Sequence, residues 1–394
     1  MEAWSVHHLS KAAQSSLDEP SVTHLKAYAQ SLQRSGIPVI FTLGHLSKIV
    51  GVDYSVLRMT VERRRESANY RMFAIKKRSG GRRHIHSVTG ELLRTQQFIN
   101  SEILQKFDPH SASFAFHPKG GVRNCASKHC GARWMFQYDL ADFFHSIDES
   151  DVYSIFSGMG YRPLLAFEMA RVCTTLRLPK HLMHLLNMPN RSSFGKNYTL
   201  YQKVVDVRGF GALPSPSPMG VLPQGAPTSP MLSNLAAYKL DIELTEFADN
   251  HGLIYTRYAD DLTFSSIENF PKELSIGDIH RSVIGIIRKN KFIENRKKTR
   301  VAGPGSKKTV LGLLVDGDLP RLSKETYKRI DRHLYAIKKY GITAVSNYEK
   351  FDTPLGFYNH LAGLVAFVKD VDIQRWNEFH SRFSSINSPT KIND

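Results

Sequence analysis

The sequence has few of the features that mark secreted or membrane-spanning proteins. It contains three cysteines in 394 residues, Cys125, Cys130 and Cys173, which excludes a disulfide framework and suits a reducing cytoplasm. No stretch approaches the roughly 18 consecutive apolar residues of a transmembrane helix. The first residues lack the basic stretch and apolar core of a signal peptide. We therefore expect a cytoplasmic protein without a membrane-spanning segment.

Acidic residues are also scarce, with 36 Asp and Glu against 53 Lys and Arg, which gives a formal charge of +17. Such an excess indicates a polyanionic partner, either nucleic acid or an anionic membrane surface. Because 41% of the residues are hydrophobic, the chain can build a sizeable core, and wholesale disorder is excluded. At roughly 100–200 residues per domain, the length predicts two or three packed units.

The basic residues are concentrated in three segments. Ten fall in 58–83 with two acids, nine in 288–308 with one acid, and seven in 321–339 with two acids. Each segment also contains aromatic or aliphatic residues, so the charges belong to folded elements rather than to a flexible tail. A solvated helix face explains any one of these segments equally well. The three together favour a protein that binds nucleic acid and has no membrane partner.

Hydrophobic periodicity predicts a chain that mixes helices and strands. Helices are expected over residues 1–36, 42–65, 89–107, 150–160, 163–176, 229–247, 276–290 and from 323 onward. Strands are expected over residues 70–75, 84–86, 133–138, 254–258, 262–265 and 310–315. Residues 187–220 are rich in Pro, Gly and Ser, which is typical of an exposed loop or insertion. The short helices in 42–65 resemble a helix-turn-helix, so a DNA-binding regulator is an alternative, although it leaves most of the chain unexplained.

The strongest local signal is the acidic pair Asp260 and Asp261, which follows Tyr258 in a two-residue turn between apolar strands. A turn tolerates aspartate well, and this would explain an isolated pair. Asp139, however, ends another apolar strand. A carboxylate at a strand end, beside those of a neighbouring hairpin, forms a cage for two Mg²⁺ ions about 4 Å apart. Two such ions clamp the attacking and leaving oxygens of a phosphoryl displacement.

A third motif is the loop from Leu222 to Pro230, which leads into a helix predicted to have Ser229 as its N-cap. Gly225 lets the backbone approach a ligand closely, and Gln224 offers amide donors and an acceptor. Taken alone, this loop would be no more than a helix cap rich in Pro and Gly.

Together these motifs resemble the reverse transcriptase family. The Tyr-Ala-Asp-Asp hairpin is that family's catalytic sequence, Asp139 matches its first catalytic acid, and Gln224-Gly225 matches its glutamine-glycine loop, in the family's order. The resemblance covers about residues 70–320. It implies an α+β right-hand polymerase with an N-terminal helical region (1–69), fingers and palm (70–300, with the insertion at about 187–220), and a primer-grip hairpin and helical thumb (301–394).

The resemblance further implies an RNA-directed DNA polymerase that transfers deoxynucleotides onto a primer hydroxyl. Asp139 and Asp260 would hold both Mg²⁺ ions with help from the Leu140 carbonyl, and Asp261 would complete the site. A non-catalytic RNA-binding scaffold is the alternative from another class of protein, but a scaffold would not need to keep all three acids. We therefore expect an active enzyme that uses an RNA template, a primer and deoxynucleoside triphosphates.

The implied substrate contacts lie on the predicted hairpin and on the glutamine-glycine loop. Lys76 and Arg83 match the fingers residues that hold the triphosphate of the incoming nucleotide, with Lys77 as a near competitor. Gln224 and Gly225 match family residues that contact the substrate. The basic tip of the hairpin is thus expected to bind phosphate rather than to lie in solvent.

Two further residues have a structural alternative. Phe144 lies five residues after Asp139, where the family has an aromatic gate that excludes a 2′-hydroxyl, so we expect Phe143 to be the core residue of the pair. Lys298 matches the lysine of the segment after the catalytic hairpin and is a candidate general acid for the pyrophosphate. It is equally well explained as a surface lysine in a basic run.

Within the family, the chain most resembles bacterial retron reverse transcriptases. Residues 125–129, Cys-Ala-Ser-Lys-His, match the retron Asn-Ala-x-x-His element with Cys in place of Asn, and residues 310–312 match Val-Thr-Gly with Leu in place of Thr. Such an enzyme copies a structured non-coding RNA into single-stranded DNA and works with a toxic effector protein in anti-phage defence. The unknown-group and abortive-infection reverse transcriptases of bacterial defence remain the alternative.

The predicted nucleic-acid contacts lie outside the carboxylate cluster. Zinc binding by Cys125, His129 and Cys130 is disfavoured by the His-Cys adjacency, so His129 is expected to contact RNA or to cap a helix. Basic residues at helical spacing in the expected thumb could follow a duplex backbone. The predicted contacts of the primer grip and thumb are Leu311, Gly312, Lys324, Lys328 and Arg332.

Overall fold

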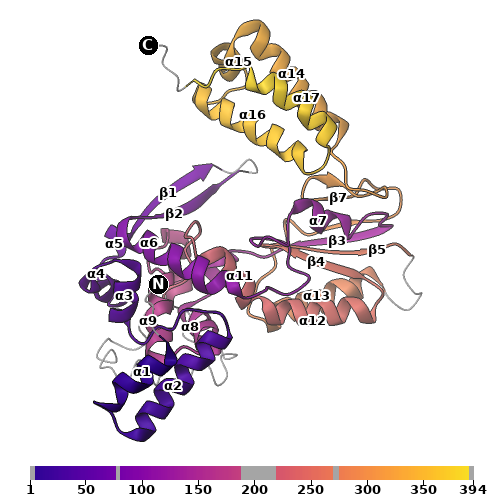
Figure 1. The fold of residues 1–394 in the computed structure, drawn as a ribbon. Coiled ribbons are helices and arrows are strands. Elements are labelled where there is room, and N and C mark those ends of the chain that lie inside the picture. The colour runs from indigo at the N-terminus through magenta and orange to yellow at the C-terminus, as the bar shows by residue number, and fades with distance from the viewer. Residues whose placement is uncertain (1–4, 77–79, 188–218, 269–274, 390–394) are drawn as a thin grey trace.

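The computed structural model describes residues 5–76, 80–187, 219–268 and 275–389 (Figure 1). Helices pack on three small antiparallel sheets, so the α+β class predicted from the sequence is confirmed. Most of the expected insertion at 187–220 lies outside the described residues, as does Lys77. Most buried apolar residues belong to two cores, a large one that joins the N-terminal helices to one face of the central sheet and a second one that joins the opposite face to the C-terminal helices.

The N-terminal region consists of five helices that pack into the large core. They are α1 (Val6–Gln14), α2 (Glu19–Arg34), α3 (Leu43–Val50), α4 (Tyr54–Val61) and α5 (Glu66–Asn69). The helix predicted over 1–36 is therefore two helices. Gly51 ends α3 in the left-handed conformation (φ 64°), which glycine adopts without strain. Leu46 of α3 and Leu57 of α4 are fully buried in the same core as the central sheet, so these helices are not an independent unit.

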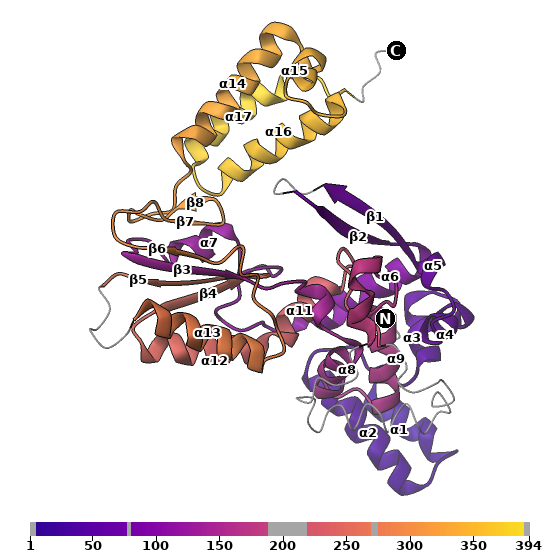
Figure 2. The same ribbon diagram turned by 180° about the vertical axis from the view of Figure 1, so that it is seen from behind.

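A long hairpin follows, made of β1 (Tyr70–Lys76) and β2 (Arg82–Val88). Its register pairs Tyr70 with Val88 at the base and Lys76 with Arg82 near the tip. The base is buried and the tip is exposed, and the hairpin projects toward the C-terminal helices (Figures 1 and 2). The helix predicted over 89–107 is α6 (Gly90–Phe98), which continues as a π-helical turn, η1 (Ile99–Ile103), and a 3-10 turn, η2 (Leu104–Lys106).

The central sheet has the strand order β4-β5-β3-β6 and is antiparallel throughout. One face is covered by α12 (Tyr238–Asn250) and α13 (Ile276–Lys289), and α7 (Val122–Ser127) lies on the other (Figures 1 and 2). Its strands are β3 (Trp134–Asp139), β4 (Ile254–Tyr258), β5 (Asp261–Ser266) and β6 (Arg300–Ala302). Because β6 pairs with β3, the sheet continues two residues past the boundary predicted at residue 300.

Shorter elements complete the large core. They are η3 (Phe144–Ser146), α8 (Glu149–Gly158), α9 (Pro163–Cys173), η4 (Lys180–Asn187) and α11 (Ser229–Ala236). The helix predicted over 229–247 divides at Ala237 into α11 and α12. The expected cap is also wrong: Thr228 is the N-cap of α11, and the Ser229 hydroxyl donates to the Pro223 carbonyl at 2.7 Å. Ser229 thus stabilises the preceding loop rather than the first turn of the helix.

The C-terminal part begins with a small hairpin where one strand was expected over 310–315. It is formed by β7 (Thr309–Val310) and β8 (Leu313–Leu314), because Leu311 (φ 51°) and Gly312 (φ 86°) turn the chain back. The four helices that follow are α14 (Lys324–Tyr340), α15 (Ile342–Tyr348), α16 (Pro354–Lys369) and α17 (Ile373–Ser384). Within the described ranges, no helix is both long enough and apolar enough to cross a membrane.

A buried ionic cluster joins the N-terminal region to α8 and α9. Glu149 is fully buried, and its carboxylate accepts hydrogen bonds from Arg63 Nη2 (2.5 Å) and Arg171 Nε (2.8 Å). Arg63, just after α4, also donates to the carbonyl oxygens of Thr174 (2.6 Å) and Arg171 (3.1 Å) at the end of α9. Because these charges are paired inside the protein, removing one leaves another uncompensated.

The substitution Glu149→Gln removes the charge that both arginines share and keeps the side-chain shape. We expect it to lower the free energy of unfolding by about 3–5 kcal/mol, the cost of breaking a buried ion pair. Chemical denaturation followed by circular dichroism measures this change. Asp108→Asn is the matched control, because Asp108 pairs with Lys119 at the surface, where both side chains are 74% exposed, and should matter far less. Equal effects of the two substitutions would contradict the prediction.

Candidate active site

Three aspartates meet where β3 ends and β5 begins. The register of the two strands places Asp139, the last residue of β3, directly opposite Asp261, the first residue of β5. Asp260 precedes Asp261 in a two-residue turn with Ala259, which has a positive φ of 56°. The Leu140 amide donates to the Asp260 carbonyl at 2.9 Å and ties this turn to the end of β3. The structure thus brings together the three acids predicted as catalytic.

The Asp139 carboxylate is held by two side chains from the segment after α13. Lys298 Nζ lies 2.5 Å from Oδ2, and Asn295 Nδ2 donates to Oδ1 at 3.0 Å. The Asn295 amide also donates to the Asp139 carbonyl at 2.7 Å. Lys298 is therefore bonded beside the aspartates, although more than half of its side chain is exposed. Sequence reasoning misses Asn295, whose only signal is its place three residues before Lys298.

The aspartates alter one another's ionisation. Burial, reinforced by the charge of Asp139, raises the pKa of Asp260. Burial, together with the charges of Asp260 and Asp139, raises the pKa of Asp261 to about 6. For Lys298, burial disfavours the charged form, but the hydrogen bond to Asp139 and the charge of Asp139 outweigh it, so its pKa is raised. The site therefore concentrates negative charge and keeps one cation within it.

The donor atoms of this cluster suit a divalent cation. Carboxylate oxygens are the ligands that Mg²⁺ prefers, and close like charges favour a bound cation. In the part of the chain that the structure describes, however, no group of three or more acidic, histidine or cysteine side chains is arranged as a finished metal site. The two oxygens of Asp139 are bonded to Lys298 and Asn295. Each carboxylate oxygen keeps a second lone pair, so these bonds leave Asp139 able to bind a cation.

The Gln224-Gly225 loop is clamped to the second strand of the long hairpin. The His86 amide donates to the Gln224 carbonyl at 2.8 Å. Gly225 has a φ of 109°, and a Cβ there would lie 2.9 Å from Ile85 Cγ2 and 3.0 Å from the His86 carbonyl oxygen. Only glycine permits so close an approach. The loop and the adjoining part of β2 therefore form one unit.

The predicted triphosphate contacts lie near the tip of the same hairpin. Lys76 ends β1 opposite Arg82, and Arg83 lies opposite Ile75. Lys76 and Arg83 are both exposed. The charge of Arg83 favours the ionised form of Asp260, although burial dominates the pKa of that aspartate. Arg83 is thus linked electrostatically to the acidic cluster.

The two phenylalanines after Asp139 differ in burial. Phe143 is 3% exposed within the large core, which confirms the expectation that it is the core residue of the pair. Phe144, at the start of η3, is only partly buried, and its ring centroid lies 5.6 Å from that of Phe143 and 6.2 Å from that of Phe116. Phe116 carries no sequence signal, because nothing in its local pattern distinguishes it. The gate role of Phe144 stays a prediction.

The expectation that His129 contacts RNA is wrong. His129 is fully buried just after α7, where Nδ1 lies 2.7 Å from Ser265 Oγ and Nε2 lies 2.7 Å from Thr256 Oγ1. Burial lowers its pKa to about 4, so the ring is neutral. It therefore bridges β4 and β5 from the face of the sheet that carries α7, which is a structural task.

The other predicted nucleic-acid contacts lie away from the aspartates. Lys324, Lys328 and Arg332 follow one another at four-residue intervals on α14 and are exposed. Leu311 and Gly312 form the turn of the β7–β8 hairpin, which lies between the central sheet and the C-terminal helices (Figure 2). Their contact with nucleic acid stays a prediction.

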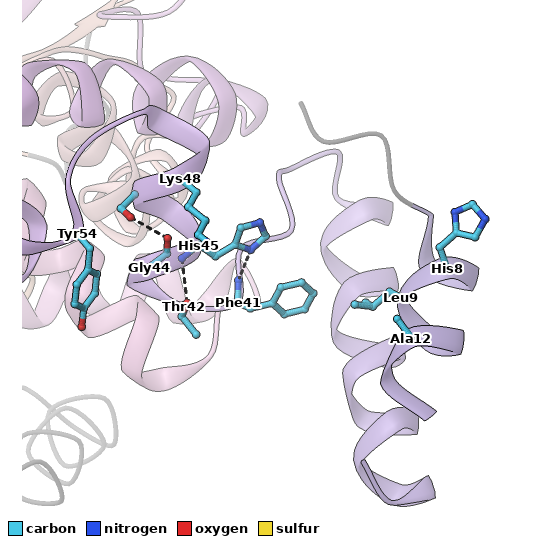
Figure 3. Close-up of a pocket in the computed structure, with 10 residues that line it drawn as sticks. His8, Leu9, Ala12, Phe41, Thr42, Gly44, His45, Lys48 and Tyr54 are labelled. Atoms are coloured by element: carbon cyan, nitrogen blue, oxygen red, sulfur yellow. Dashed lines mark hydrogen bonds between the residues drawn. The ribbon is translucent and has the colours of Figure 1, made fainter. Parts of the chain in front are cut away.

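A separate cavity of about 840 Å³ lies between α1 and α3. Figure 3 shows the Phe41 ring pointing toward Leu9 and Ala12 of α1, and this ring stacks on His45 with a centroid distance of 5.4 Å. The other residues that line the cavity include Tyr54 at the start of α4. None of its lining residues is a predicted site residue, so the cavity belongs to the N-terminal helices and not to the acidic cluster.

Comparisons with known proteins agree with this geometry. The family described as reverse transcriptase (RNA-dependent DNA polymerase) matches residues 75–315, more than half of the chain. Retron Ec86 reverse transcriptase of Escherichia coli is 28% identical over 343 residues, which cover 86% of this chain and 88% of that protein. Retron Mx65 reverse transcriptase of Myxococcus xanthus is 30% identical over 341 residues, which cover 86% of this chain and 70% of that protein.

Among solved structures, a telomerase from Candida albicans in complex with a TWJ fragment of telomeric RNA aligns with a TM-score of 0.37 and 12% identity. The alignment covers 80% of this chain and 56% of the telomerase chain. A likeness at this level carries no argument about function.

We predict that Asp261→Asn stabilises the metal-free protein as the pH rises. The folded-state pKa of about 6 lies above the ordinary 3.8, so the protonated group favours folding below the ordinary pKa. Wild type loses that contribution as the pH rises through about 6. Asparagine does not titrate, so the variant loses nothing over this range. Relative to wild type, the variant should gain up to about 1 kcal/mol between pH 4 and pH 7, because solvent still reaches this partly buried carboxylate and screens its charge.

Denaturation in chelator at several pH values measures this difference. Asp108→Asn provides a control of opposite sign, because the hydrogen bond and charge of Lys119 lower the pKa of Asp108. That variant should lose stability relative to wild type as the pH rises. A difference for Asp261→Asn that stays flat or falls with pH would contradict the prediction.

Proposed function

The chain belongs to the reverse transcriptase family, is of retron type and is an RNA-directed DNA polymerase, and from this premise we propose that it copies a structured non-coding RNA into single-stranded DNA by two-metal nucleotidyl transfer. One observation carries the proposal for the chemistry. The β3–β5 register sets Asp139 opposite Asp261, with Asp260 in the adjoining turn and Lys298 bonded to Asp139. This arrangement supplies both the negative charge that a metal pair needs and a proton donor beside it.

In this proposal, Asp139, Asp260 and Asp261 hold two Mg²⁺ ions with the Leu140 carbonyl. Bound Mg²⁺ would activate the primer hydroxyl and neutralise the leaving pyrophosphate. Lys298 stays protonated because its pKa is raised, and once released by Asp139 it can give its proton to the pyrophosphate. Its 54% exposed side chain leaves room for that movement.

The incoming nucleotide would lie between the long hairpin and the Gln224-Gly225 loop. Lys76 and Arg83 would donate charge-assisted hydrogen bonds to its β- and γ-phosphates. Phe144 would exclude a 2′-hydroxyl by contact with the sugar. The clamp between the loop and β2 supports this placement, because it fixes the loop relative to the strand that carries Arg83.

Template and primer would pass between the β1–β2 hairpin and α14–α17 (Figure 1). We assign the fingers and palm to residues 70–302, so that they include all of β6, with the N-terminal helices at 1–69 and the thumb after them. The β7–β8 turn at Leu311 and Gly312 would grip the primer. Lys324, Lys328 and Arg332 would follow the phosphate backbone.

The retron relatives support a role in which the template is a structured non-coding RNA and the product a branched RNA–DNA molecule. A toxic effector protein in anti-phage defence and a cytoplasmic location belong to the same proposal. The second candidate is another reverse transcriptase of bacterial defence, of the unknown or abortive-infection group. It is favoured by the two altered retron elements, Cys125 in place of Asn and Leu311 in place of Thr.

We expect the wild-type protein, co-expressed with its co-encoded RNA, to copurify with a branched RNA–DNA species. The double substitution Asp260→Asn/Asp261→Asn should still copurify RNA but carry no DNA. Its incorporation of deoxynucleotides on a primed RNA template with Mg²⁺ should fall by at least about two orders of magnitude, because the transition-state charge loses its metal support. Nuclease digestion, sequencing and primer extension measure these outcomes.

Asp249→Asn is the control for this experiment, since Asp249 is an exposed acid at the end of α12 and should be silent. Full incorporation by the double variant would contradict the metal assignment. An active wild-type enzyme that carries no branched species would favour the second candidate. A wild-type protein that incorporates nothing on its own RNA would overturn the proposed function.

RNA binding should depend steeply on salt through the basic face of α14. The triple substitution Lys324→Ala/Lys328→Ala/Arg332→Ala removes three charges that we assign to phosphates. The slope of log affinity against log salt concentration should shrink by about 0.7 for each lost contact, about 2 in all. Fluorescence anisotropy with the cognate RNA in a salt series measures the slope. The control Lys239→Ala, which removes a 75% exposed lysine on α12, should leave the slope unchanged. An unchanged slope in the triple variant would contradict the assignment.

A further inference from the structure

A buried arginine is bonded to the turn that carries the aspartates. Arg257, on β4, has no exposed surface, and its guanidinium makes a two-point ion pair with Asp241 of α12, with Nε–Oδ1 at 2.7 Å and Nη2–Oδ2 at 2.6 Å. Its remaining nitrogen, Nη1, donates to the carbonyl of Ala259 at 3.2 Å and to Oδ1 of Asn234 on α11 at 3.1 Å. The turn that holds Asp260 is therefore fixed to two helices through one side chain.

The same residues fix a second segment, 112–116, which we call the strap. The backbone of Arg257 pairs with it on both sides, donating from its amide to Ala112 (2.7 Å) and accepting from the Phe114 amide (2.8 Å). Asn234 Nδ2 donates to the Ala115 carbonyl at 2.8 Å, and Ser113 Oγ donates to Asn234 Oδ1 at 3.0 Å. The strap is thus anchored at nearly every residue by groups that also position the catalytic turn.

The strap ends in a strained aromatic residue. Phe116 has a φ of 67°, a conformation that costs energy for a bulky residue and persists only where the surroundings impose it. The chain folds back immediately afterwards, and a Cβ on Gly120 would clash with the Phe114 carbonyl, so only glycine fits there. Phe116 is 37% exposed despite being held so firmly. Packing in the core does not account for a strained and exposed ring on an anchored segment, whereas contact with a ligand would.

Phe116 lies beside the predicted gate. Its ring centroid is 6.2 Å from that of Phe144, whose other neighbour, Phe143, lies 5.6 Å away. The guanidinium of Arg257 is 5.8 Å from the Phe143 ring. Arg257 therefore lies beside Phe143, which packs against Phe144. Through the strap, Arg257 also sets the position of Phe116.

We infer that Phe116 is a second specificity-determining residue, which packs beside Phe144 along the sugar of the incoming nucleotide. In this inference, Arg257 is the positioning residue that sets both the Phe116–Phe144 pair and the turn that carries Asp260. The inference rests on the proposed function, because it assigns the Phe144 side of the site to the nucleotide sugar. Two rings in contact resist displacement better than one. Without Phe116, Phe144 can move aside and admit a 2′-hydroxyl.

The first test compares single-nucleotide incorporation of deoxy- and ribonucleoside triphosphates by the full chain on a primed RNA template. Phe116→Gly removes the ring and tolerates the positive φ, and Phe116→Ala removes the ring alone. Both should lower the ratio of kcat/KM for the deoxynucleotide to that for the ribonucleotide by about tenfold or more, the discrimination that one steric contact supplies. Tyr54→Ala, which removes a 50% exposed ring from α4, is the matched control and should leave the ratio unchanged.

The second test separates positioning from stability. Arg257→Lys keeps the charge opposite Asp241 but loses the two-point pair and the fork that reaches Ala259 and Asn234. At a temperature where the variant is folded, kcat should fall by tenfold to about a hundredfold, as expected for a small misplacement of catalytic groups, and nucleotide discrimination should fall with it. Tyr255→Phe removes a different hydrogen bond to Asp241 (2.9 Å) and should change stability without changing discrimination. If Arg257→Lys does not fold, Ser113→Ala loosens the strap alone and should lower discrimination.

The outcomes distinguish the inference from the proposed function. A wild-type protein that incorporates no nucleotide refutes the proposed function and the inference together. A wild-type protein that discriminates against ribonucleotides, with Phe116 variants that discriminate equally well, overturns the inference alone. Folded Arg257→Lys protein with wild-type kcat and discrimination, or Ser113→Ala protein with wild-type discrimination, shows that these residues serve stability only.

Discussion

The pairing of β3 with β5 is the constraint on which the acidic cluster depends. Side chains of a strand alternate between its two faces, so a slip of one residue would turn Asp139 away from Asp261. Buried residues farther along the strands prevent this slip, because Phe136 lies opposite Phe264 and both are fully buried. The packing of the core and the geometry of the site are therefore set by the same pair of strands.

The large positive charge of the chain is divided between two physical environments. Arg171 and Arg257 are buried, and the Arg63 side chain is only 9% exposed. Arg63 and Arg171 join helices through Glu149, and Arg257 joins the sheet to α12 through Asp241. Exposed basic residues lie on the β1–β2 hairpin (Lys76, Arg82 and Arg83) and on α14 (Lys324, Lys328 and Arg332), and the hairpin projects toward the C-terminal helices (Figure 1). Net charge indicates a polyanionic partner, but burial decides which of the charges can reach it.

Local sequence predicted the parts of the site that local structure creates. The Asp260–Asp261 turn and the strand end at Asp139 are recognisable because a short apolar run stops at an acid. His129 was misjudged, because a polar residue in a basic segment gives no sign that two hydroxyl groups will enclose it. Phe116 could not be found, because its position is set by side chains more than a hundred residues away. The β7–β8 turn was read as strand because it places Leu311 at a positive φ that leucine seldom adopts.

The bond between the His86 amide and the Gln224 carbonyl gives the long hairpin a fulcrum. Gly225 is packed directly against Ile85 and the His86 backbone, so this stretch of β2 is held against the loop. If the hairpin bends, we expect it to bend at this point, so that the part between His86 and the tip moves as one arm. Displacement then grows with distance from the pivot, so the Lys76–Arg82 pair would travel farther than the residues beside the glutamine-glycine loop. The two ends of the hairpin can thus differ in mobility: the end near the tip can move, while the part bonded to the glutamine-glycine loop stays in place.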